Sequence, residues 1–368
     1  MDDSDKIKVL LFSDAAYTGG AEKYIYYLAR YLPCRKHVVI EGEPGPERLK
    51  SWLDDIEVPF TVISSDSITK RFCKLFGLMR DIRPDFLHIN LPGPFDAHYS
   101  MAAPLAKVAG VNYIITTEHL PMNRPFWKSR ILKGFSTRFV DCVITVSRNN
   151  RRYLINNHKV PEKKIRVIYN GIPDPLKEGV SLRKFPGSGE NIFRVALVGS
   201  LLPKKGQKEA VEAIRRLDER IHLYLAGEGS MEWRLREMVK KYGLESRVHF
   251  MGYVDDVYGF LGDKDLLLVP SSVEATPYTV IEGLAIGIPV IASEIYGIPE
   301  MIENGKTGIL IDRCNLESAI RSMFENRSLL RDISIEGRDH YEKLFQVEKS
   351  VNETMNVYRE LMLMGRTR

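Results

Sequence analysis

The stretch FRVALVGSLLPKKGQ, residues 193–207, has the pattern of a hydrophobic strand, a glycine-containing loop and the start of a helix. The chain opens in the same way, with IKVLLFSD at 7–14, the loop AAYTGGAE at 15–22 and an amphipathic helix. A pattern that restarts halfway along a chain indicates two Rossmann-like α/β domains rather than one enlarged sheet. Ligands of open parallel sheets bind beyond the carboxyl ends of the strands, so we expect the site in a cleft between the domains.

Short β-branched runs alternate with amphipathic stretches along the chain, as in βαβ units with parallel sheets. The expected strands are 7–14, 37–42, 60–65, 85–90, 113–119, 141–147, 165–172, 193–200, 221–229, 248–254, 265–272, 289–294 and 308–311. Residues 174–191 are rich in Pro, Gly, Ser and charge, which predicts a linker between domains at 1–173 and 192–346. From about Val347 onward we expect an exposed helix, either a tail or a strap.

Composition and cysteine content narrow the class of protein. A chain of 368 residues with 44% hydrophobic and 27% charged residues is typical of a soluble globular protein of two domains. The acidic start MDDSDKIK is not expected to be a signal peptide, and no uninterrupted apolar run reaches the ~20 residues of a membrane-spanning helix. The four cysteines match neither a disulfide framework nor a zinc pattern, so we expect small core residues and a cytoplasmic location.

Positive charge is concentrated in the first half of the chain. Residues 1–180 hold 27 Lys and Arg against 20 Asp and Glu, although the net charge of the whole chain is only +5. The segment 124–152 has eight basic residues and one acidic residue, with aromatic and aliphatic residues between them. Such a helix can rest on an anionic membrane, or its apolar side can pack in the core. Nucleic acid is not expected, because the cluster is short and no recognition motif accompanies it.

Two strand-to-helix loops are candidate anion sites. Gly19 and Gly20 let the backbone approach a ligand at a helix amino end, although a tight turn needs the same residues. The loop is not a P-loop and lacks G-x-G-x-x-G, which disfavours a nicotinamide oxidoreductase. In the second loop, Lys204 or Lys205 could neutralise a phosphate, or the two could be a solvated pair.

The stretch EATPYTVIE, residues 274–282, combines a predicted helix start with two glutamates. Thr276 suits an N-cap and Pro277 the first helical position, so the N–H groups near Tyr278 and Thr279 could hold a phosphate. Along a helix, eight residues at 1.5 Å each approach ~12 Å.

That span excludes a glycosidase pair from Glu274 and Glu282, because hydrolases need carboxyl groups ~5–9.5 Å apart. Two separate hydroxyl-binding roles fit better, unless Glu282 is an ordinary exposed helical residue. His119 ends an expected strand, where it either lines the site or only packs. We interpret the D-x-D string at 263–265 as chance, because it precedes a strand.

Together these motifs resemble the family 4 glycosyltransferases, retaining enzymes of the GT-B fold, in which two Rossmann-like domains with parallel sheets face across a cleft. The resemblance covers nearly the whole chain, and its E-x7-E signature is Glu274 to Glu282. Further matching motifs are GGAE (19–22), TEH (117–119), VSRNNRRYL (146–154), VIYNGI (167–172), LVGSLLPKKGQ (197–207), LAGEGS (225–230), GYVDDVYGFL (252–261) and GIPEMIENGKTGILI (297–311).

The resemblance implies a role for each part of the second domain. Glu282 would bind the ribose of a nucleotide sugar, and Glu274 would hold hydroxyls of the transferred sugar. Lys205 would stabilise the departing diphosphate, with backbone amides near Tyr278 and Thr279. Two departures weaken this pattern: Ser200 stands where the family often has Arg, so Lys205, with Lys204 beside it, must contribute more, and Pro277 has no N–H to donate. The donor-binding set also includes Thr276.

The first domain has implied roles too. Gly20, beside Gly19, would approach the donor phosphate, and His119 would contact the donor sugar as a third catalytic residue with Lys205 and Glu274. Tyr253 of the second domain would lie near the nucleobase, and the final helix, about 347–368, would return to the first domain.

Retaining transfer in this family is described as front-face attack, in which the protein chiefly positions substrates and stabilises charge. No metal or cofactor is expected. The donor would be UDP- or GDP-linked. The acceptor would be a sugar, lipid-linked or other hydroxyl of cell-surface polysaccharide or glycolipid synthesis, and a peripheral position at the inner face of the cell membrane would suit it. A nucleotide-sugar 2-epimerase of the same fold and a non-catalytic binding module remain open alternatives.

Overall fold

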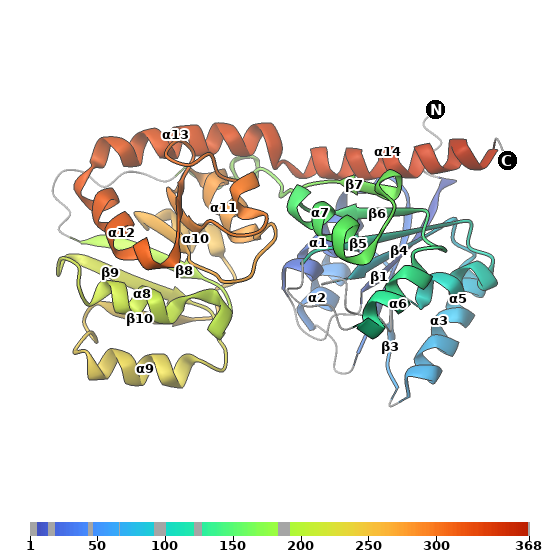
Figure 1. Cartoon of the computed structure of the whole chain (residues 1–368), viewed down its shortest axis with the longest axis horizontal. Coiled ribbons are helices and arrows are strands. Elements are labelled where there is room, and N and C mark those ends of the chain that lie inside the picture. The colour runs from blue at the N-terminus through green and yellow to red at the C-terminus, as the bar shows by residue number, and fades with distance from the viewer. Residues whose placement is uncertain are drawn as a thin grey trace. The chain divides into compact units, whose positions relative to one another are not determined.

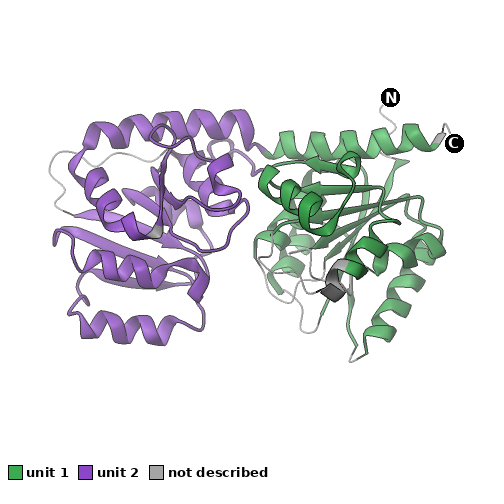
Figure 2. Cartoon of the chain, in the orientation of Figure 1, with its two compact units in different colours: residues 1–170, 347–368 green, residues 171–346 purple. Residues whose placement is uncertain are grey.

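The computed structural model describes residues 6–13, 19–42, 47–65, 67–91, 101–120, 127–182 and 192–366, with the backbone alone at 127–130, 313 and 366. The chain forms two compact units, residues 1–170 with 347–368 and residues 171–346 (Figure 2). Each unit has one sheet with helices packed against it (Figure 1). Residues 14–18 of the first loop and Arg124 of the basic segment lie outside the described residues, as does 183–191 of the expected linker.

The sheet of the first unit is parallel throughout and has seven strands in the order β3-β2-β1-β4-β5-β6-β7. The chain builds outward from β1 in one direction and then from β4 in the other, so the order reverses between these two strands. The strands are β1 Lys8–Ser13, β2 Arg35–Glu41, β3 Phe60–Ile63, β4 Phe86–Leu91, β5 Tyr113–Glu118, β6 Cys142–Thr145 and β7 Ile165–Val167.

The sheet of the second unit repeats this plan with six parallel strands in the order β10-β9-β8-β11-β12-β13. Here the order reverses between β8 and β11. The strands are β8 Phe193–Val198, β9 Ile221–Ala226, β10 Val248–Gly252, β11 Leu266–Val269, β12 Val290–Ser293 and β13 Ile309–Ile311. The prediction of two parallel α/β sheets is confirmed, and every expected strand is present.

Helices cover both faces of each sheet. In the first unit, α3, α5 and α7 pack over the core that includes Leu10 and Leu87, while α1 and α14 cover the opposite face. The helices of this unit are α1 Gly20–Tyr31, α2 Glu47–Asp55, α3 Ile68–Ile82, α5 Ala102–Ala109, α6 Trp127–Ser136, α7 Arg148–His158 and α14 Val347–Arg366. Those of the second unit are α8 Gln207–Ile214, α9 Glu232–Lys241, α10 Val257–Gly262, α11 Tyr278–Ile286, α12 Leu316–Glu325 and α13 Arg327–Leu344.

The last helix, α14, is part of the core of the first unit. Its Tyr358 is fully buried, stacks on Phe86 at a ring separation of 4.6 Å and places its hydroxyl 2.6 Å from Nδ1 of His88. The other ring nitrogen of His88 lies 2.6 Å from Oγ1 of Thr117 on β5. Our expectation of an exposed helix was therefore wrong for this side, because apolar and hydrogen-bonding partners on β4 and β5 bury it.

Residues 174–182 of the expected linker pack on the second unit. The buried carboxylate of Asp174 accepts two hydrogen bonds from Arg338 of α13, at 2.8 and 2.9 Å.

The expectation of four core cysteines was also partly wrong. Only Cys142 is buried, whereas Cys73 and Cys314 are exposed.

Helix α11 begins one residue later than its sequence predicts. Pro277 is the N-cap with an extended backbone, no side chain caps the helix, and Tyr278 is the first helical residue. Gly287 ends the helix in a left-handed conformation. The helix lies close to the sheet at Gly283, where a Cβ atom would come 2.7 Å from the Leu267 side chain. Nearly every residue of α11 is buried as a result.

Gly206 provides a test of how tightly the β8–α8 loop is held. Its φ is +80°, and a Cβ atom there would lie 2.2 Å from the carbonyl oxygen of Pro270, whereas Gly243 has φ +65° and open space around it. Gly243→Ala should reduce the free energy of unfolding by about 1–2 kcal/mol. Gly206→Ala should cost about 1–3 kcal/mol more, because Pro270 must move. Urea denaturation of both variants measures this difference, and equal losses would contradict it.

Candidate functional site

The loops that follow β8 and β11 meet at the point where the strand order of the second unit reverses. An ion pair joins the ammonium of Lys205, from the first loop, to Oε1 of Glu274, from the second. Reversal points at the carboxyl edge of a parallel sheet are where such folds bind ligands, since the two loops diverge there. The pair is partly accessible, with side-chain exposures of 26% for Lys205 and 11% for Glu274.

Hydrogen bonds to backbone carbonyls fix the lysine loop and join it to the glutamate loop. The backbone N–H of Ser272 donates across the two loops to the carbonyl of Lys204 at 2.7 Å, and within the lysine loop the side-chain amide of Gln207 donates to the carbonyl of Ser200 at 3.0 Å. The side chains of Ser200 and Lys204 are exposed. In the described structure, therefore, these two residues shape the loop through their carbonyls and leave Lys205 as the lysine that contacts Glu274.

Both glutamates of the signature are buried. Glu274 is 8% exposed and lies 3.2 Å from the hydroxyl of Ser271, while Glu282, in the second turn of α11, is 3% exposed. Glu282 is thus not an ordinary solvated helical residue. Charged side chains are rarely buried unless they have partners, so the burial itself indicates a role beyond solubility.

The start of α11 and the loop after β10 contain the remaining donor-site candidates of this unit. Thr276 and Tyr278 are buried and Thr279 is half-buried, so the first turn of the helix sits beside the Glu274 loop. The backbone N–H groups of a first helical turn have no acceptors within the helix and attract anions. Tyr253 is 40% exposed just after the edge strand β10.

In the first unit, Gly19 and Gly20 lie at the corresponding reversal point, after β1 and at the start of α1. The N–H of Gly19 donates to the carboxylate of Glu22 at 2.6 Å, which fixes the turn. Burial raises the pKa of Glu22 to about 7, against the opposing effect of this hydrogen bond. The Glu22 carboxyl group thus ties Gly19 to the first turn of α1.

His119 follows β5 and is held in one orientation. The amide of Asn90 donates to the carbonyl of Ala21 at 3.0 Å, so its oxygen is the atom 2.7 Å from Nε2 of His119 and accepts a hydrogen bond from it. Nδ1 is then the ring nitrogen with a lone pair. Burial lowers the pKa of His119 to about 3, so the ring is neutral at physiological pH. It is available as a hydrogen-bond acceptor, not as a cation.

The sequence analysis missed a buried ion pair beside His119. Lys133 of α6 contacts Oε1 of Glu118, and both residues are buried, so Lys133 is not part of the exposed basic surface. Within the described residues, Oε2 of Glu118 has no hydrogen-bond partner, while the side-chain amide of Asn150 donates to the Glu118 carbonyl at 3.0 Å. The sequence did contain a signal for this ion pair. Glu118 ends an apolar strand, and a carboxylate buried there requires a partner.

The D-x-D string has a structural role. Asp265 is buried and accepts a hydrogen bond from the backbone N–H of Arg194 at 2.6 Å, which joins β8 to the start of β11. Asp263 instead pairs with the adjacent Lys264.

Among the helices that the structure describes, none combines the length and apolar character needed to cross a bilayer.

Two family models match the two halves of the chain. The model described as Glycosyltransferase Family 4 matches residues 18–174, and the model described as Glycosyl transferases group 1 matches residues 181–340. Two relatives align over most of the chain. The N-acetyl-alpha-D-glucosaminyl L-malate synthase of Bacillus anthracis is 27% identical over 76% of this chain and 75% of its own length.

The second relative is the UDP-Gal:alpha-D-GlcNAc-diphosphoundecaprenol alpha-1,3-galactosyltransferase of Escherichia coli, 24% identical over 87% of this chain and 88% of its own length. Two uncharacterized glycosyltransferases of Methanocaldococcus jannaschii, each 28% identical, align over only 61% and 64% of their own length. Among solved structures, HepE of Anabaena in complex with UDP superimposes with a TM-score of 0.83 at 20% identity, covering 96% of this chain and all of the other. This likeness establishes the GT-B fold.

The buried pair of α6 and β5 makes a prediction about stability. Lys133→Met leaves the Glu118 carboxylate buried without a counter-ion, and breaking such a pair costs about 3–5 kcal/mol of unfolding free energy. The double variant Lys133→Met with Glu118→Gln should recover part of this loss, because no buried charge remains. Lys208→Met, at a lysine that is 61% exposed, is the control and should change little. A single variant as stable as this control in urea would contradict the role of the pair.

Proposed function

The chain belongs to the family 4 glycosyltransferases, and on this basis we propose that it is a retaining enzyme that moves a sugar from a nucleotide-diphosphate donor to an acceptor hydroxyl. The observation that supports this most is the Lys205–Glu274 pair at the strand reversal of the second unit, with Glu282 buried on the adjacent helix. A cation, a hydroxyl-binding carboxylate and a helix amino end are the groups that a nucleotide sugar requires.

In this proposal the donor lies along the carboxyl edge of the second unit. Glu282 accepts hydrogen bonds from the ribose, the N–H groups near Tyr278 and Thr279 contact the phosphates, and Glu274 accepts from hydroxyls of the sugar. Tyr253 lies near the base of the donor nucleotide. We favour a UDP-linked donor over a GDP-linked one. The support for UDP is that a structural neighbour binds it and that a relative is named for UDP-galactose.

Transfer in this proposal is a front-face displacement. The acceptor oxygen bonds to the anomeric carbon as the bond from that carbon to the diphosphate oxygen breaks, and the acceptor proton passes to the leaving phosphate. Lys205 carries three N–H donors, so it can keep its contact with Glu274 and still neutralise the departing diphosphate. Nδ1 of His119 accepts a hydrogen bond from a sugar hydroxyl. Gly19 and Gly20 let the backbone after β1 come close to the donor phosphate. No metal or cofactor is part of this scheme, in which Lys204 and the α11 amino end add positive potential.

We further propose that the acceptor is lipid-linked, in polysaccharide or glycolipid synthesis, and that the first unit rests on an anionic membrane. Three apolar side chains of α6 are exposed: Ile131 at 63%, Phe135 at 42% and Leu132 at 37%. An apolar side packed in the core would hide them. Basic residues of the segment 124–152 flank them in sequence, which is the composition of an interfacial helix.

The donor site makes a prediction about ligand binding and turnover. UDP and UDP-sugars should raise the melting temperature of the wild-type protein, and Glu282→Ala should remove most of this shift because the ribose loses its partner. Lys205→Ala should lower kcat by at least about a hundredfold, as is usual when a donor to developing negative charge is removed. Lys208→Ala, at an exposed lysine of the same region of sequence, should leave both unchanged. Near-normal turnover in Lys205→Ala or Glu282→Ala would refute the assignment.

Membrane binding can be tested with two isoleucines of matched exposure. Ile131 on α6 is 63% exposed and Ile335 on α13 is 62% exposed. Ile131→Ser should weaken binding to phosphatidylglycerol vesicles at least about tenfold, since a buried isoleucine contributes about 1.5–3 kcal/mol and 1.4 kcal/mol is a factor of ten, and Ile335→Ser should not. Added salt should weaken binding of all variants. Absence of vesicle binding by the wild type at low salt would exclude the membrane surface.

A further inference from the structure

Helix α1 reaches the ring of His119 in two ways. Nε2 of the ring donates to the side-chain oxygen of Asn90, whose amide donates to the carbonyl of Ala21 in the first turn of the helix. One turn further along α1, the ring of Tyr24 meets the imidazole edge to face, with ring centroids 4.9 Å apart and an interplanar angle of 75°. Tyr24 and His119 are both buried. The same helix thus holds His119 through a backbone carbonyl and through an aromatic ring.

These two contacts restrict different motions of the imidazole. The hydrogen bond from His119 fixes Nε2, an atom that lies close to the axis of the Cβ–Cγ bond. The ring can therefore turn about that bond with little change in the hydrogen bond, and histidine has only a broad preference for this torsion. Such a turn moves Nδ1, the atom with the lone pair. The ring of Tyr24 opposes it, because an edge-to-face pair is stabilised in one relative orientation.

A chain of buried hydrogen bonds holds Tyr24 in turn. Its hydroxyl lies 3.0 Å from Oγ1 of Thr117, and that oxygen lies 2.6 Å from Nε2 of His88. Nδ1 of His88 lies 2.6 Å from the hydroxyl of Tyr358 on α14. Burial lowers the pKa of His88 to about 3, so this ring is neutral and donates one of its two hydrogen bonds while it accepts the other. A buried network with a partner at each step is rigid.

Strand pairing explains why these groups meet. Asn90 of β4 pairs with Thr117 of β5, and side chains two residues apart on a strand project to the same face. His88 and Asn90 therefore share one face of the sheet with Thr117 and His119. This is the face that α1 and α14 cover, so both helices contribute to the network.

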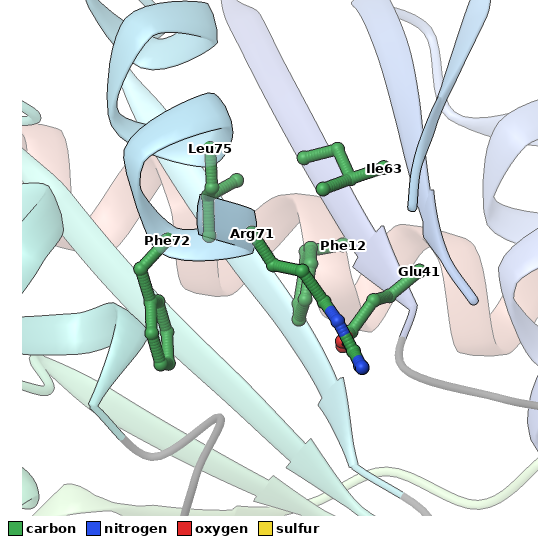
Figure 3. Close-up of a pocket in the computed structure, with 6 residues that line it drawn as sticks. All are labelled: Phe12, Glu41, Ile63, Arg71, Phe72 and Leu75. Atoms are coloured by element: carbon green, nitrogen blue, oxygen red, sulfur yellow. The ribbon is translucent and has the colours of Figure 1, made fainter. Parts of the chain in front are cut away.

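The opposite face of this sheet has a different character among the described residues. Where β1, β2 and β3 end and α3 begins, apolar side chains and the Glu41–Arg71 ion pair leave a cavity of about 10 Å³ (Figure 3). Its lining residues are Phe12, Glu41, Ile63, Arg71, Phe72 and Leu75. A cavity of this size holds about one water, so it belongs to the packing of the core. The hydrogen-bonded network lies on the α1 face.

We propose that Tyr24 is a positioning residue for His119, because its ring sets the plane of the imidazole and with it the direction of the Nδ1 lone pair. The chain through Thr117 and His88 fixes Tyr24 and ends on Tyr358, so the last helix contributes to the geometry of His119. The proposal rests on the proposed transferase function in one respect, which is the assignment of a sugar hydroxyl to Nδ1. It adds to the site a residue that acts through His119.

NMR relaxation of histidine-labelled protein tests the restraint without any ligand. The probe is the Cδ2–H bond of His119, whose signal is identified by its absence in His119→Ala. Its order parameter should be high in the wild type and should fall in Tyr24→Leu, because the ring that opposes the turn is gone. Tyr24→Phe keeps the ring and should retain most of the order. An unchanged order parameter in Tyr24→Leu would overturn the proposal.

Tyr153→Leu is the matched control for the loss of a tyrosine ring. Tyr153 makes a comparable contact with His158 in the same unit, with ring centroids 5.5 Å apart and an interplanar angle of 57°. The variant should leave the order parameter of His119 as it is in the wild type. An equal fall in both leucine variants would mean that a general loosening of the unit, and not the contact with Tyr24, releases the ring, which would also overturn the proposal.

Calorimetric binding to the full chain tests the consequence for the site. The probes are UDP, UDP-glucose, UDP-galactose and UDP-N-acetylglucosamine. For the UDP-sugar that the wild type binds most tightly, His119→Ala and Tyr24→Leu should each weaken binding about fivefold, the effect of one neutral hydrogen bond. Binding of UDP should not change, because UDP lacks the sugar. The double variant should bind no more weakly than His119→Ala alone, since Tyr24 acts through His119.

The outcomes separate this proposal from the proposed function. Additive losses in the double variant, or a Tyr24→Leu effect of equal size on UDP and on the UDP-sugar, would mean that Tyr24 only supports the fold. Equal binding of the UDP-sugar by the wild type and His119→Ala would remove the sugar contact that Tyr24 is proposed to position. If neither UDP nor a UDP-sugar binds the wild type, the donor assignment fails, and the order parameter of His119 still decides whether Tyr24 holds the ring.

Discussion

The parallel sheet, buried on both faces, is the constraint on which the rest of this molecule depends. Helices cover β1–β7 and β8–β13 on either side, so side chains in the middle of the strands are mostly apolar, and a polar one such as His88 needs buried hydrogen-bond partners. Polar groups that are open to a ligand are expected where strands end and the chain turns into a helix. Both units place their candidate residues there, and both have glycines or lysines in the loop at which the strand order reverses.

Charges at these edges are stabilised in pairs, and the pairs differ in access to solvent. Lys133–Glu118 is fully enclosed, whereas Lys205–Glu274 is partly open. An enclosed pair contributes little net stability, but the loss of one partner is costly, so it fixes the position of α6 on β5. The open pair can accept a further anion without first being broken, because the lysine has N–H groups to spare. The same kind of contact thus serves structure in one unit and, in our proposal, ligand binding in the other.

Most of the architecture could be predicted because parallel strands are continuous apolar runs, and each of the expected strands is present. Boundaries were less certain: the helix at 278–286 starts one residue late, since Pro277 keeps an extended backbone. The burial of Glu282 could not be read from its neighbours, because it depends on α11 lying against β11 at Gly283. The partners of Glu118 and Glu41 were also missed. Lys133 lies 15 residues from Glu118 and Arg71 lies 30 residues from Glu41, so neither helix nor strand periodicity relates the partners.

Helix α14 has a consequence for the way the chain is made. The first unit needs residues 347–366 for its core, since Tyr358 covers Phe86 and contacts His88. During synthesis the first 170 residues leave the ribosome before this helix is made, because the whole second unit lies between them in the chain. The second unit is contiguous, from 171 to 346, and has all of its own strands before that point. Of the two units, the one whose synthesis begins first can therefore complete its core only after the other has been made in full.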